Sequence, residues 1–550
     1  MMRRLVAGAV VLGCCALPCF GQSSAYEGTP AARALDQKGR DAEQDNKDGE
    51  ALADFKKAIA LDPDYADAYE DEIFVAGSAA IQAMGLTGDE TDPKKVARGT
   101  KRAEQVTRSE VKEFTKQARR HPDKPIYLWA LGQIYDESDP LKQEQYCRKA
   151  VAVDARFAPG YECLAEVADL RGDDKAYSAL CAKVAALEPD SAKAAITYLR
   201  TLRKGDPAAY KAGAAALIEK FPTDPAAAEA LYWYAMDQKT DAEKVAGFEQ
   251  LRRQFPPEKY WWSENGMEEL FAIEDRTDPA KARALADDMA RLKPQGDDWA
   301  EYTGYADGVA KAEQELKEGR AAEAVATLKL VKRPYYSYDM RRELLLNARA
   351  LNASAGPADA YAFLLDAYAK HPTDEVGAAL EMYGAKLGKS TADVHAAVWA
   401  AVEKAATPAI PFTLPGFDGG KPVSLADYRG HVVVVDFWFP NCGPCRVSFP
   451  YLAELERKYK DKGVVVLAIN DMKGQEPFVL PFLRSQGYDF VPLQADEAWT
   501  NNVYHVRAFP TSFLIGADGR QYFAAHHNLD DVEEQNEELE IDELLAHSGE

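Results

Sequence analysis

The chain has 550 residues, of which 47% are hydrophobic and 28% are charged, and its formal net charge is −23. This length exceeds what one ordinary hydrophobic core can hold, so we expect two to four domains. The acidic excess argues against binding to nucleic acid or to an anionic membrane surface, because both attract basic patches.

Residues 1–25 are typical of a signal peptide. A basic start precedes the apolar stretch Leu5 to Phe20, and small and polar residues follow. The stretch is shorter than the roughly 20 residues of a membrane span, and an uncleaved anchor is the alternative. Val11 to Cys14 also resembles a bacterial lipoprotein box. The sequence predicts export to the periplasm or cell envelope, with membrane contact only through an uncleaved signal or a lipid on Cys14.

Five cysteines follow the signal peptide, and they fall into two groups: Cys147, Cys163 and Cys181, then Cys442 and Cys445. Export allows disulfides to persist, but five cysteines are too few to staple a chain of this size. The first three lie at apolar positions of predicted helices and are interpreted as small buried hydrophobic residues. A disulfide within this group, leaving one odd thiol, is the alternative. The close pair is expected to be catalytic.

The first 400 residues predict an all-α array. Apolar residues recur at helical spacing, and a helix end, a proline and an acidic residue recur together; Pro189 and Pro222, 33 residues apart, show the spacing. A period of about 34 residues resembles tetratricopeptide repeats. Residues 26–200 match the repeat, and 201–403 are expected to be irregular helical repeats. The matching positions are Ala51, Phe55, Ala58 and Pro63, then Leu128, Leu131, Gly132 and Tyr135.

The resemblance to repeats implies an extended surface that can bind a protein partner. The sequence does not identify the residues of such a surface. The aromatic residues of the array are interpreted as helix-packing residues.

A different pattern begins after a linker and entry segment at 404–422, which is rich in proline and glycine. Short β-branched runs at 432–435 and 464–469 predict buried parallel strands. Strands that alternate with helices indicate an α/β domain, placed at 408–550 and ending in an acidic C-terminal tail. Further elements are expected as helices at 450–460 and 478–486 and as strands at 513–515 and 521–524.

The sequence Cys442-Gly443-Pro444-Cys445 directly follows the first of these strands. Such a pair exchanges with other disulfides: one thiolate attacks and the second thiol resolves the mixed disulfide. Unpaired N–H groups and the dipole at a helix N-terminus stabilise a thiolate, so Cys442 is expected to attack and Cys445 to resolve. Pro444 suits the first helical turn, where no N–H is needed. No cofactor is expected.

Residues 434–446 resemble the active-site segment of thioredoxins, and especially of the exported TlpA/ResA-like branch. An entry segment at 412–430 and a downstream segment at 509–520 match the same family in the same order. The resemblance implies a thioredoxin fold and thiol–disulfide oxidoreductase activity on protein thiols or disulfides, with an unidentified redox partner. Gly443 and Pro444 match the pair found in reducing thioredoxins, which favours a reductase.

The resemblance also implies roles for single residues. Asp436 matches a buried acid with a raised pKa that exchanges a proton with Cys445; a strand-end cap is the alternative. The lysine that usually partners this acid is not evident. Phe509 and Pro510 match a cis-proline whose backbone pairs with a substrate strand.

The remaining substrate-binding candidates are Trp438, Gly443 and Pro444. Trp438 matches the family's packing tryptophan under the site. Asn441 stands where tryptophan is common, so substrate preference is expected to differ.

Three other functions compete with this interpretation. A metal site would combine the cysteine pair with His505, His526 or His527, but no second pair of cysteines completes it; we expect no metal. A repeat scaffold with an accessory thioredoxin-like domain is the main alternative. A thiol peroxidase needs a Thr-x2-Cys pattern, and position 439 is Phe.

Overall fold

A computed structural model describes residues 26–548 except for 27, 87–89, 91, 137, 204, 295, 297, 335–340 and 528–530. The predicted signal peptide, with Cys14, lies outside the described residues. Among the helices of the described part, none has both the length and the apolar character of a membrane span.

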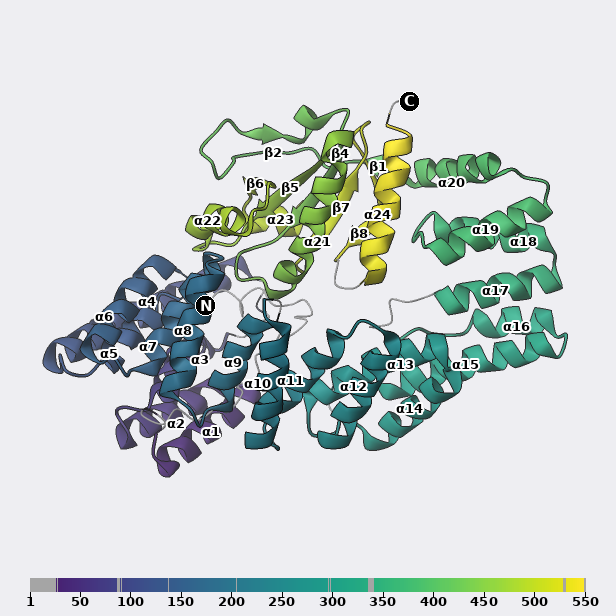
Figure 1. Ribbon diagram of the computed structural model, residues 1–550. Coiled ribbons are helices and arrows are strands. Elements are labelled where there is room, and N and C mark those ends of the chain that lie inside the picture. Colours follow the sequence, from purple (N-terminus) through teal and green to yellow (C-terminus); the bar gives the residue numbers. More distant parts are fainter. Residues whose placement is uncertain are drawn as a thin grey trace. The chain divides into compact units, whose positions relative to one another are not determined.

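The chain divides into two compact units (Figure 1). Unit 1 comprises Met1–Phe221, Phe439–Asn441 and Met472–Tyr488, and unit 2 comprises Pro222–Trp438, Cys442–Asp471 and Asp489–Glu550. The helices of unit 1 are α1 (Pro30–Gln44), α2 (Asp48–Leu61), α3 (Ala66–Gln82), α4 (Pro93–Arg120), α5 (Ile126–Gln133), α6 (Pro140–Val153), α7 (Ala158–Leu170), α8 (Asp174–Leu187), α9 (Ala192–Leu202), α10 (Pro207–Lys220) and α22 (Glu476–Gln486).

Unit 2 begins with a second run of helices. They are α11 (Pro225–Met236), α12 (Asp241–Gln254), α13 (Trp261–Thr277), α14 (Pro279–Leu292), α15 (Trp299–Lys317), α16 (Ala321–Leu328), α17 (Arg341–Ser354), α18 (Pro357–Tyr368), α19 (Asp374–Lys386) and α20 (Thr391–Ala405). In both units each helix of a run packs against the next one. The all-α part of the predicted fold class is confirmed.

Aspartate–proline pairs explain where several of these helices begin. Asp92, Asp139, Asp206 and Asp224 each accept a backbone hydrogen bond as the N-cap, and a proline follows in the first turn. The side chain satisfies an N–H that the helix leaves unpaired, and proline lacks the N–H that would otherwise need a partner. These aspartate–proline pairs therefore set the residues at which α4, α6, α10 and α11 begin.

Small residues bring neighbouring helices of unit 1 close together. Ala51, Phe55 and Ala58 of α2 are fully buried, as the repeat pattern predicts. A Cβ added to Gly132 of α5 would lie 2.8 Å from Cys147 Sγ of α6, so this position has no room for a side chain. Within the same unit, Phe478 of α22 packs with Val167 and Leu170 of α7.

The three cysteines of unit 1 do not share one role. Cys147 of α6 and Cys163 of α7 form a disulfide, and Cys181 of α8 is a buried free thiol. The interpretation of all three as hydrophobic packing residues is wrong for the bonded pair. The alternative, one disulfide and one odd thiol, is the arrangement found.

The C-terminal part of unit 2 is built on a six-stranded mixed sheet with the order β1-β8-β7-β4-β5-β6. Strands β4, β5 and β6 are parallel, and β7 is antiparallel to β4 and β8. The strands are β1 (Thr407–Pro408), β4 (Val432–Phe437), β5 (Val464–Asn470), β6 (Val491–Gln494), β7 (Thr511–Ile515) and β8 (Arg520–His526), and β2 (Thr413–Leu414) pairs separately with β3 (Val423–Ser424). The helices of this part are α21 (Gly443–Tyr459), α23 (Glu497–Asn502) and α24 (Asp531–Ala546). The predicted α/β part of the fold is confirmed.

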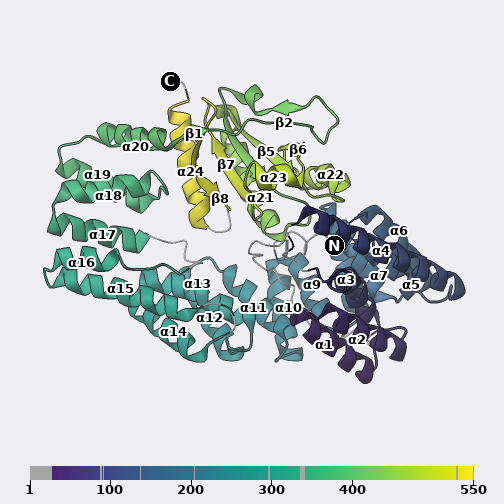
Figure 2. The ribbon, with the colours of Figure 1, turned by 180° about the vertical axis from the view of Figure 1, so that it is seen from behind.

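The two faces of β4 serve different purposes. Because side chains alternate along a strand, Val433, Val435 and Phe437 point to one face, where they share an apolar core with Tyr504. Asp436 points to the opposite face. Helix α24 packs on β4 and β8, and Figure 2 shows it running beside β7 and β8.

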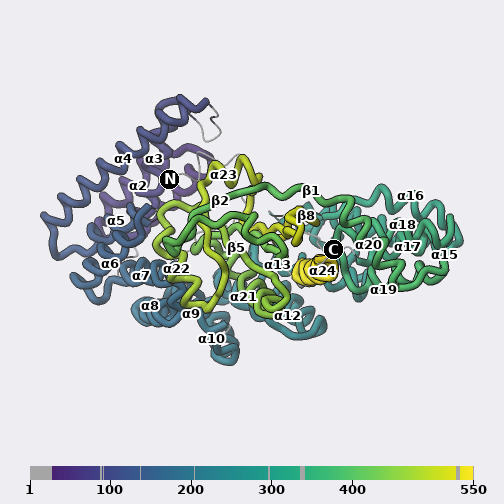
Figure 3. Tube along the Cα trace, turned by 90° about the horizontal axis from the view of Figure 1, so that it is seen from above, coloured from purple at the N-terminus to yellow at the C-terminus, as the bar shows by residue number. Residues whose placement is uncertain are grey.

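The predicted linker and entry segment and the predicted acidic tail both contain ordered elements. The predicted linker contributes β1, which pairs with β8, and β2, which pairs with β3. The predicted acidic tail is instead the packed helix α24, with Ile541 and Leu544 buried. Helix α20 also adjoins this part of unit 2, because Trp399 stacks on His547 with ring centroids 4.0 Å apart; Figure 3 shows α20 and α24 next to each other.

Candidate active site

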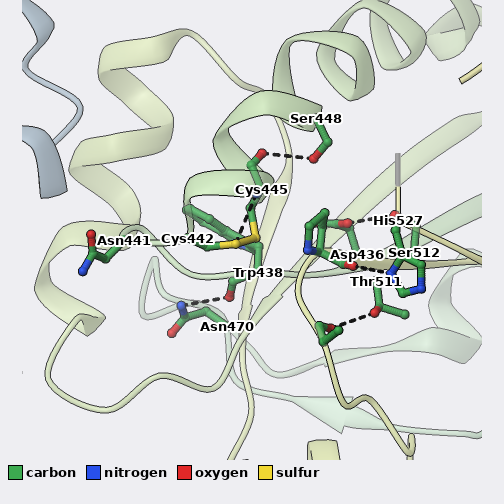
Figure 4. Close-up of a disulfide and its surroundings, with 12 residues drawn as sticks. Asp436, Trp438, Asn441, Cys442, Cys445, Ser448, Asn470, Thr511, Ser512 and His527 are labelled. Carbon is green, nitrogen blue, oxygen red and sulfur yellow. Dashed lines mark hydrogen bonds between the residues drawn. A yellow bond between two sulfur atoms is a disulfide. The ribbon is translucent and has the colours of Figure 1, made fainter. Parts of the chain in front are cut away.

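The two cysteines lie where β4 passes into α21, and they form a disulfide (Figure 4). Cys442 is the N-cap of α21, and its Sγ accepts a hydrogen bond from the Cys445 N–H at 3.2 Å. Cys442 is 3% exposed and Cys445 is fully buried. Pro444 occupies the first turn, as predicted, and Gly443 is the first residue of the helix.

This backbone setting distinguishes the two sulfurs. The helix N-terminus offers Cys442 an unpaired N–H and the positive end of the dipole, which favour a thiolate by about 0.3–1 kcal/mol and up to ~2 kcal/mol when partly buried. Cys445 sits one turn further in, and Ser448 Oγ donates to its carbonyl oxygen at 3.0 Å. The geometry fits an attacking Cys442 and a resolving Cys445.

Trp438 supports the turn from below. Its backbone N–H donates to the Ile469 carbonyl at 3.0 Å, and Asn470 Nδ2 donates to its carbonyl oxygen at 3.2 Å. Its ring lies 4.7 Å from that of Phe449, centroid to centroid. Trp438 is fully buried, as expected of a packing residue under the site, and its place among the substrate-binding residues stays a prediction.

The Phe509–Pro510 peptide bond is cis, as the sequence predicts. Thr511 Oγ1 donates to the Ala508 carbonyl at 2.8 Å, which closes the loop before β7. His527 Nδ1 lies 2.8 Å from the Pro510 carbonyl oxygen. Since a carbonyl oxygen only accepts, His527 Nδ1 must carry the hydrogen. Figure 4 shows Thr511 and His527 in the surroundings of the disulfide.

Asp436 is buried on the sheet face that α24 covers. Ser512 Oγ, from the neighbouring strand β7, donates to Asp436 Oδ1 at 2.8 Å (Figure 4). Burial raises the pKa of Asp436 well above its usual range, the hydrogen bond from Ser512 lowers it, and the charge of Glu537 raises it further. On the other side, the register places Ala468 of β5 opposite Asp436, and an alanine side chain carries no charge to compensate that of the carboxylate.

The structure adds residues that the sequence did not single out. Ser512 hydrogen-bonds to Asp436, and the charge of Glu537 raises the pKa of Asp436. Nothing in their local sequence distinguishes either residue. The candidate metal ligands His526 and His527 instead contact Glu540 and the Pro510 carbonyl, respectively. In unit 1, Gln475 Oε1 accepts the Asn441 N–H at 3.0 Å.

Comparisons with known proteins agree on the C-terminal part of the chain. The Redoxin family model matches residues 404–537. The thiol-disulfide oxidoreductase ResA of Bacillus subtilis is 33% identical over 101 residues, which are 18% of this chain and 56% of that protein. ResA of Geobacillus kaustophilus is 33% identical over 117 residues, which are 21% of this chain and 67% of that protein.

A crystal structure described as a thiol:disulfide interchange protein DsbE from Chlorobium tepidum shares 34% identity, covering 26% of this chain and 96% of that one, with a TM-score of 0.24. The chain spans just over half the length of the first of these relatives and about two thirds of the second. Through its C-terminal domain, the chain belongs to the ResA-like family of thioredoxin-fold proteins.

Proposed function

We propose that the protein is an exported thiol–disulfide oxidoreductase that reduces disulfides of client proteins through Cys442 and Cys445. The observation that carries the proposal is the pair itself: a disulfide at a helix N-terminus, with the less buried sulfur at the N-cap and a buried carboxyl, Asp436, on the preceding strand. The names of the similar ResA proteins support the reaction class.

In the reducing direction, Cys442 and Cys445 pass two electrons to a client disulfide. The Cys442 thiolate attacks one sulfur of a client disulfide, and the client S–S bond breaks to give a mixed disulfide and a client thiolate. Asp436 takes the proton from the Cys445 thiol, and the Cys445 sulfur attacks Cys442 and releases the second client thiolate. Two electrons pass to the client, and a dithiol donor must then reduce the Cys442–Cys445 disulfide.

A trapping experiment tests this function. The variant Cys445→Ser lacks the resolving thiol, so client proteins should stay bound to Cys442 through a disulfide that dithiothreitol releases. The double variant C442S/C445S is the matched control, because it keeps the buried thiol of Cys181 and both cysteines of the second disulfide. If Cys445→Ser traps no more protein than the double variant, and the wild type does not reduce insulin, the proposed function is wrong.

We further propose that the helices α1–α20 recruit the client or a partner. Stacked helices form extended surfaces that can bind a protein. Because the proposed redox pair lies in the C-terminal domain, the helices are left for binding. Lysine-specific cross-linking of the trapped adducts, followed by mass spectrometry, tests this role. Cross-links from the client to residues 26–405 are expected, and adducts cross-linked only to residues 406–548 would contradict it.

Export rests on residues 1–25 and on the family of the C-terminal domain. Removal of the signal peptide is expected, either with a lipid on Cys14 or without one. The intact mass of the mature protein distinguishes the two forms. A cellular protein that keeps Met1 and fractionates with the cytoplasm would contradict export.

A further inference from the structure

A row of buried polar residues crosses the sheet from the redox site towards α24. Asp436 on β4 pairs in register with Ser512 on β7, and Ser512 pairs in register with His526 on β8. Residues directly opposite on neighbouring strands share a face, so the three side chains lie side by side. All three are buried, among apolar residues such as Val434.

Helix α24 adds two glutamates to this row. Glu537 is 0% exposed and Glu540 is 1% exposed. They are three residues apart and therefore lie on one face of the helix. The Glu540 carboxylate is 2.6 Å from His526 Nε2, which joins α24 to the end of the row.

Such a concentration of ionisable groups in a core has a cost, because each charge loses its hydration. His526 and Glu540 offset the cost by forming an ion pair. Burial lowers the pKa of His526, but the charge and hydrogen bond of Glu540, with the charges of Glu537 and Glu533, raise it to about 9. Asp436 lacks such a partner: within the described residues its Oδ2 has no hydrogen-bond partner.

The other charged groups around the row come from three elements. Tyr451 on α21 donates a hydrogen bond to the Glu534 carbonyl oxygen of α24 at 2.7 Å. Burial, and then the charges of Glu537 and Glu534, raise the pKa of Tyr451. His371 lies between α18 and α19, and burial, followed by the charge of His526, lowers the pKa of His371. Glu533 lies on α24. Of these charged groups, only Glu537 also acts on Asp436.

We propose that Glu537 is a positioning residue that keeps the proton on Asp436 while Cys442 and Cys445 are joined, and that Ser512 opposes it. The inference rests on the proposed function and adds a control of its proton transfer. Two like charges disfavour ionisation when they are close in a buried site, so the Glu537 carboxylate favours a neutral Asp436. The Ser512 hydroxyl donates to the carboxylate and favours its ionised form.

The step that uses this proton is the reduction of the enzyme's own disulfide. A thiolate of the dithiol donor attacks Cys442 Sγ, and the Cys442–Cys445 bond breaks. Cys445 leaves with the electron pair and takes the proton of Asp436. The second donor thiolate then displaces Cys442 as a thiolate, and the donor becomes a disulfide. Asp436 is left ionised, which is the state in which it takes the proton of the Cys445 thiol in the next client reaction.

The experiment follows this step in the full chain. Rate constants for reduction of the Cys442–Cys445 disulfide by dithiothreitol are measured from pH 5 to pH 10 and divided by the fraction of dithiothreitol that is thiolate. In the wild type the corrected rate constant should fall above one apparent pKa, where Asp436 loses its proton. Glu537→Gln should move this midpoint down by about one pH unit, and Ser512→Ala should move it up.

Glu456→Gln is the matched control. Glu456 is also a buried glutamate of this domain, but its charged neighbours are Lys460 and Asp489. The pH midpoint of the corrected rate constant of Glu456→Gln should equal that of the wild type. If Glu537→Gln does not fold, Glu537→Asp withdraws the carboxylate by one methylene and must still move the midpoint down.

The outcomes separate the two proposals. A wild-type disulfide that dithiothreitol does not reduce, or whose reduced form does not reduce insulin, overturns the proposed function. A wild type that is active and shows the midpoint, with Glu537→Gln or Glu537→Asp unchanged from it, overturns only the inference. A midpoint shift of the same size in Glu456→Gln also overturns the inference, because the effect would then be a general loss of buried charge.

Discussion

The chain carries two disulfides whose settings differ. Cys147 and Cys163 join two helices, α6 and α7, and are 16 residues apart in sequence. Cys442 and Cys445 lie within one turn at the start of a single helix. All four sulfurs belong to buried residues, so burial alone does not separate a structural disulfide from a reactive one.

The difference lies in what surrounds each pair. A thiolate at Cys442 gains the N–H of Cys445 and the end of the helix dipole, and the preceding strand carries an ionisable carboxyl, Asp436, one residue before its end. Cys147 and Cys163 fall within α6 and α7, away from the first turn of either helix. The helix N-terminus and the nearby carboxyl favour breaking the Cys442–Cys445 bond, whereas the Cys147–Cys163 disulfide only restrains the chain.

The largest expected effect is on insulin reduction, and it distinguishes the Cys442–Cys445 pair from the Cys147–Cys163 pair. Cys442→Ser should abolish insulin reduction, a loss of at least about 10³-fold, because no other described sulfur occupies a helix N-cap. The double variant C147S/C163S, assayed at a temperature where it is folded, should keep more than half of the wild-type rate. Comparable losses in both variants would mean that the helical disulfide takes part in electron transfer.

A smaller effect is expected from Asp436→Asn. The amide keeps the volume and can still accept from Ser512 Oγ, but it cannot carry a proton to or from Cys445. General acid–base groups contribute about 10²–10⁴-fold, so we expect a rate loss near the lower end, about 10²-fold, in stopped-flow reduction of the Cys442–Cys445 disulfide. The pH dependence of the corrected rate constant should vanish with it. A variant that keeps the wild-type profile would exclude Asp436 from proton transfer.

The sequence predicted the reactive pair far better than its surroundings, for a physical reason. The strand at 432–435, the dithiol motif and Pro510 are local patterns, and each is recognisable without knowing its neighbours. Ser512 and Glu537 matter only because strand register and helix packing bring them to Asp436. In sequence, the stretch containing Glu537 and Glu540 is an acidic run, which is typical of a solvated tail.

The Cys147–Cys163 disulfide also depends on packing that the sequence pattern does not reveal. Cys147 and Cys163 lie at apolar positions of neighbouring helices, where buried cysteines usually pack as free thiols. Whether two such residues bond depends on how closely the helices approach, and α6 and α7 bring the Cα atoms of Cys147 and Cys163 to 6.3 Å from each other. The spacing of cysteines alone could not choose between the two outcomes.

Loss of the helical disulfide should appear as a loss of stability. Closing a loop of about 15 residues restrains the unfolded chain by about 3 kcal/mol. The double variant C147S/C163S should therefore unfold at lower denaturant concentration in the helical transition, followed by circular dichroism at 222 nm. C442S/C445S removes a disulfide that closes a much shorter loop, with a sequence separation of 3, and should leave that transition unchanged. Equal midpoints for C147S/C163S and wild type would show that the disulfide does not restrain the unfolded chain.

The smallest expected effect is the pH dependence of stability that comes from the buried His526–Glu540 pair in the domain of the Cys442–Cys445 disulfide. His526 titrates at a raised pKa of about 9 in the folded protein, against about 6.5 when unfolded. A raised pKa means that the folded state holds the proton more tightly, so the stabilisation is complete below about pH 6.5 and is lost as the pH rises through about 9. The size is on the order of 1–3 kcal/mol, since one pKa unit corresponds to about 1.4 kcal/mol.

Denaturant unfolding at pH 6.5 and pH 9.5 measures this loss in the transition of the C-terminal domain. His526→Gln should show a smaller difference between the two pH values than the wild type, because glutamine cannot gain a charge beside Glu540. The helical transition of unit 1 should not change with this substitution. A wild-type difference that persists in His526→Gln would assign the pH dependence to other groups and leave the His526–Glu540 pair without a measurable share in stability.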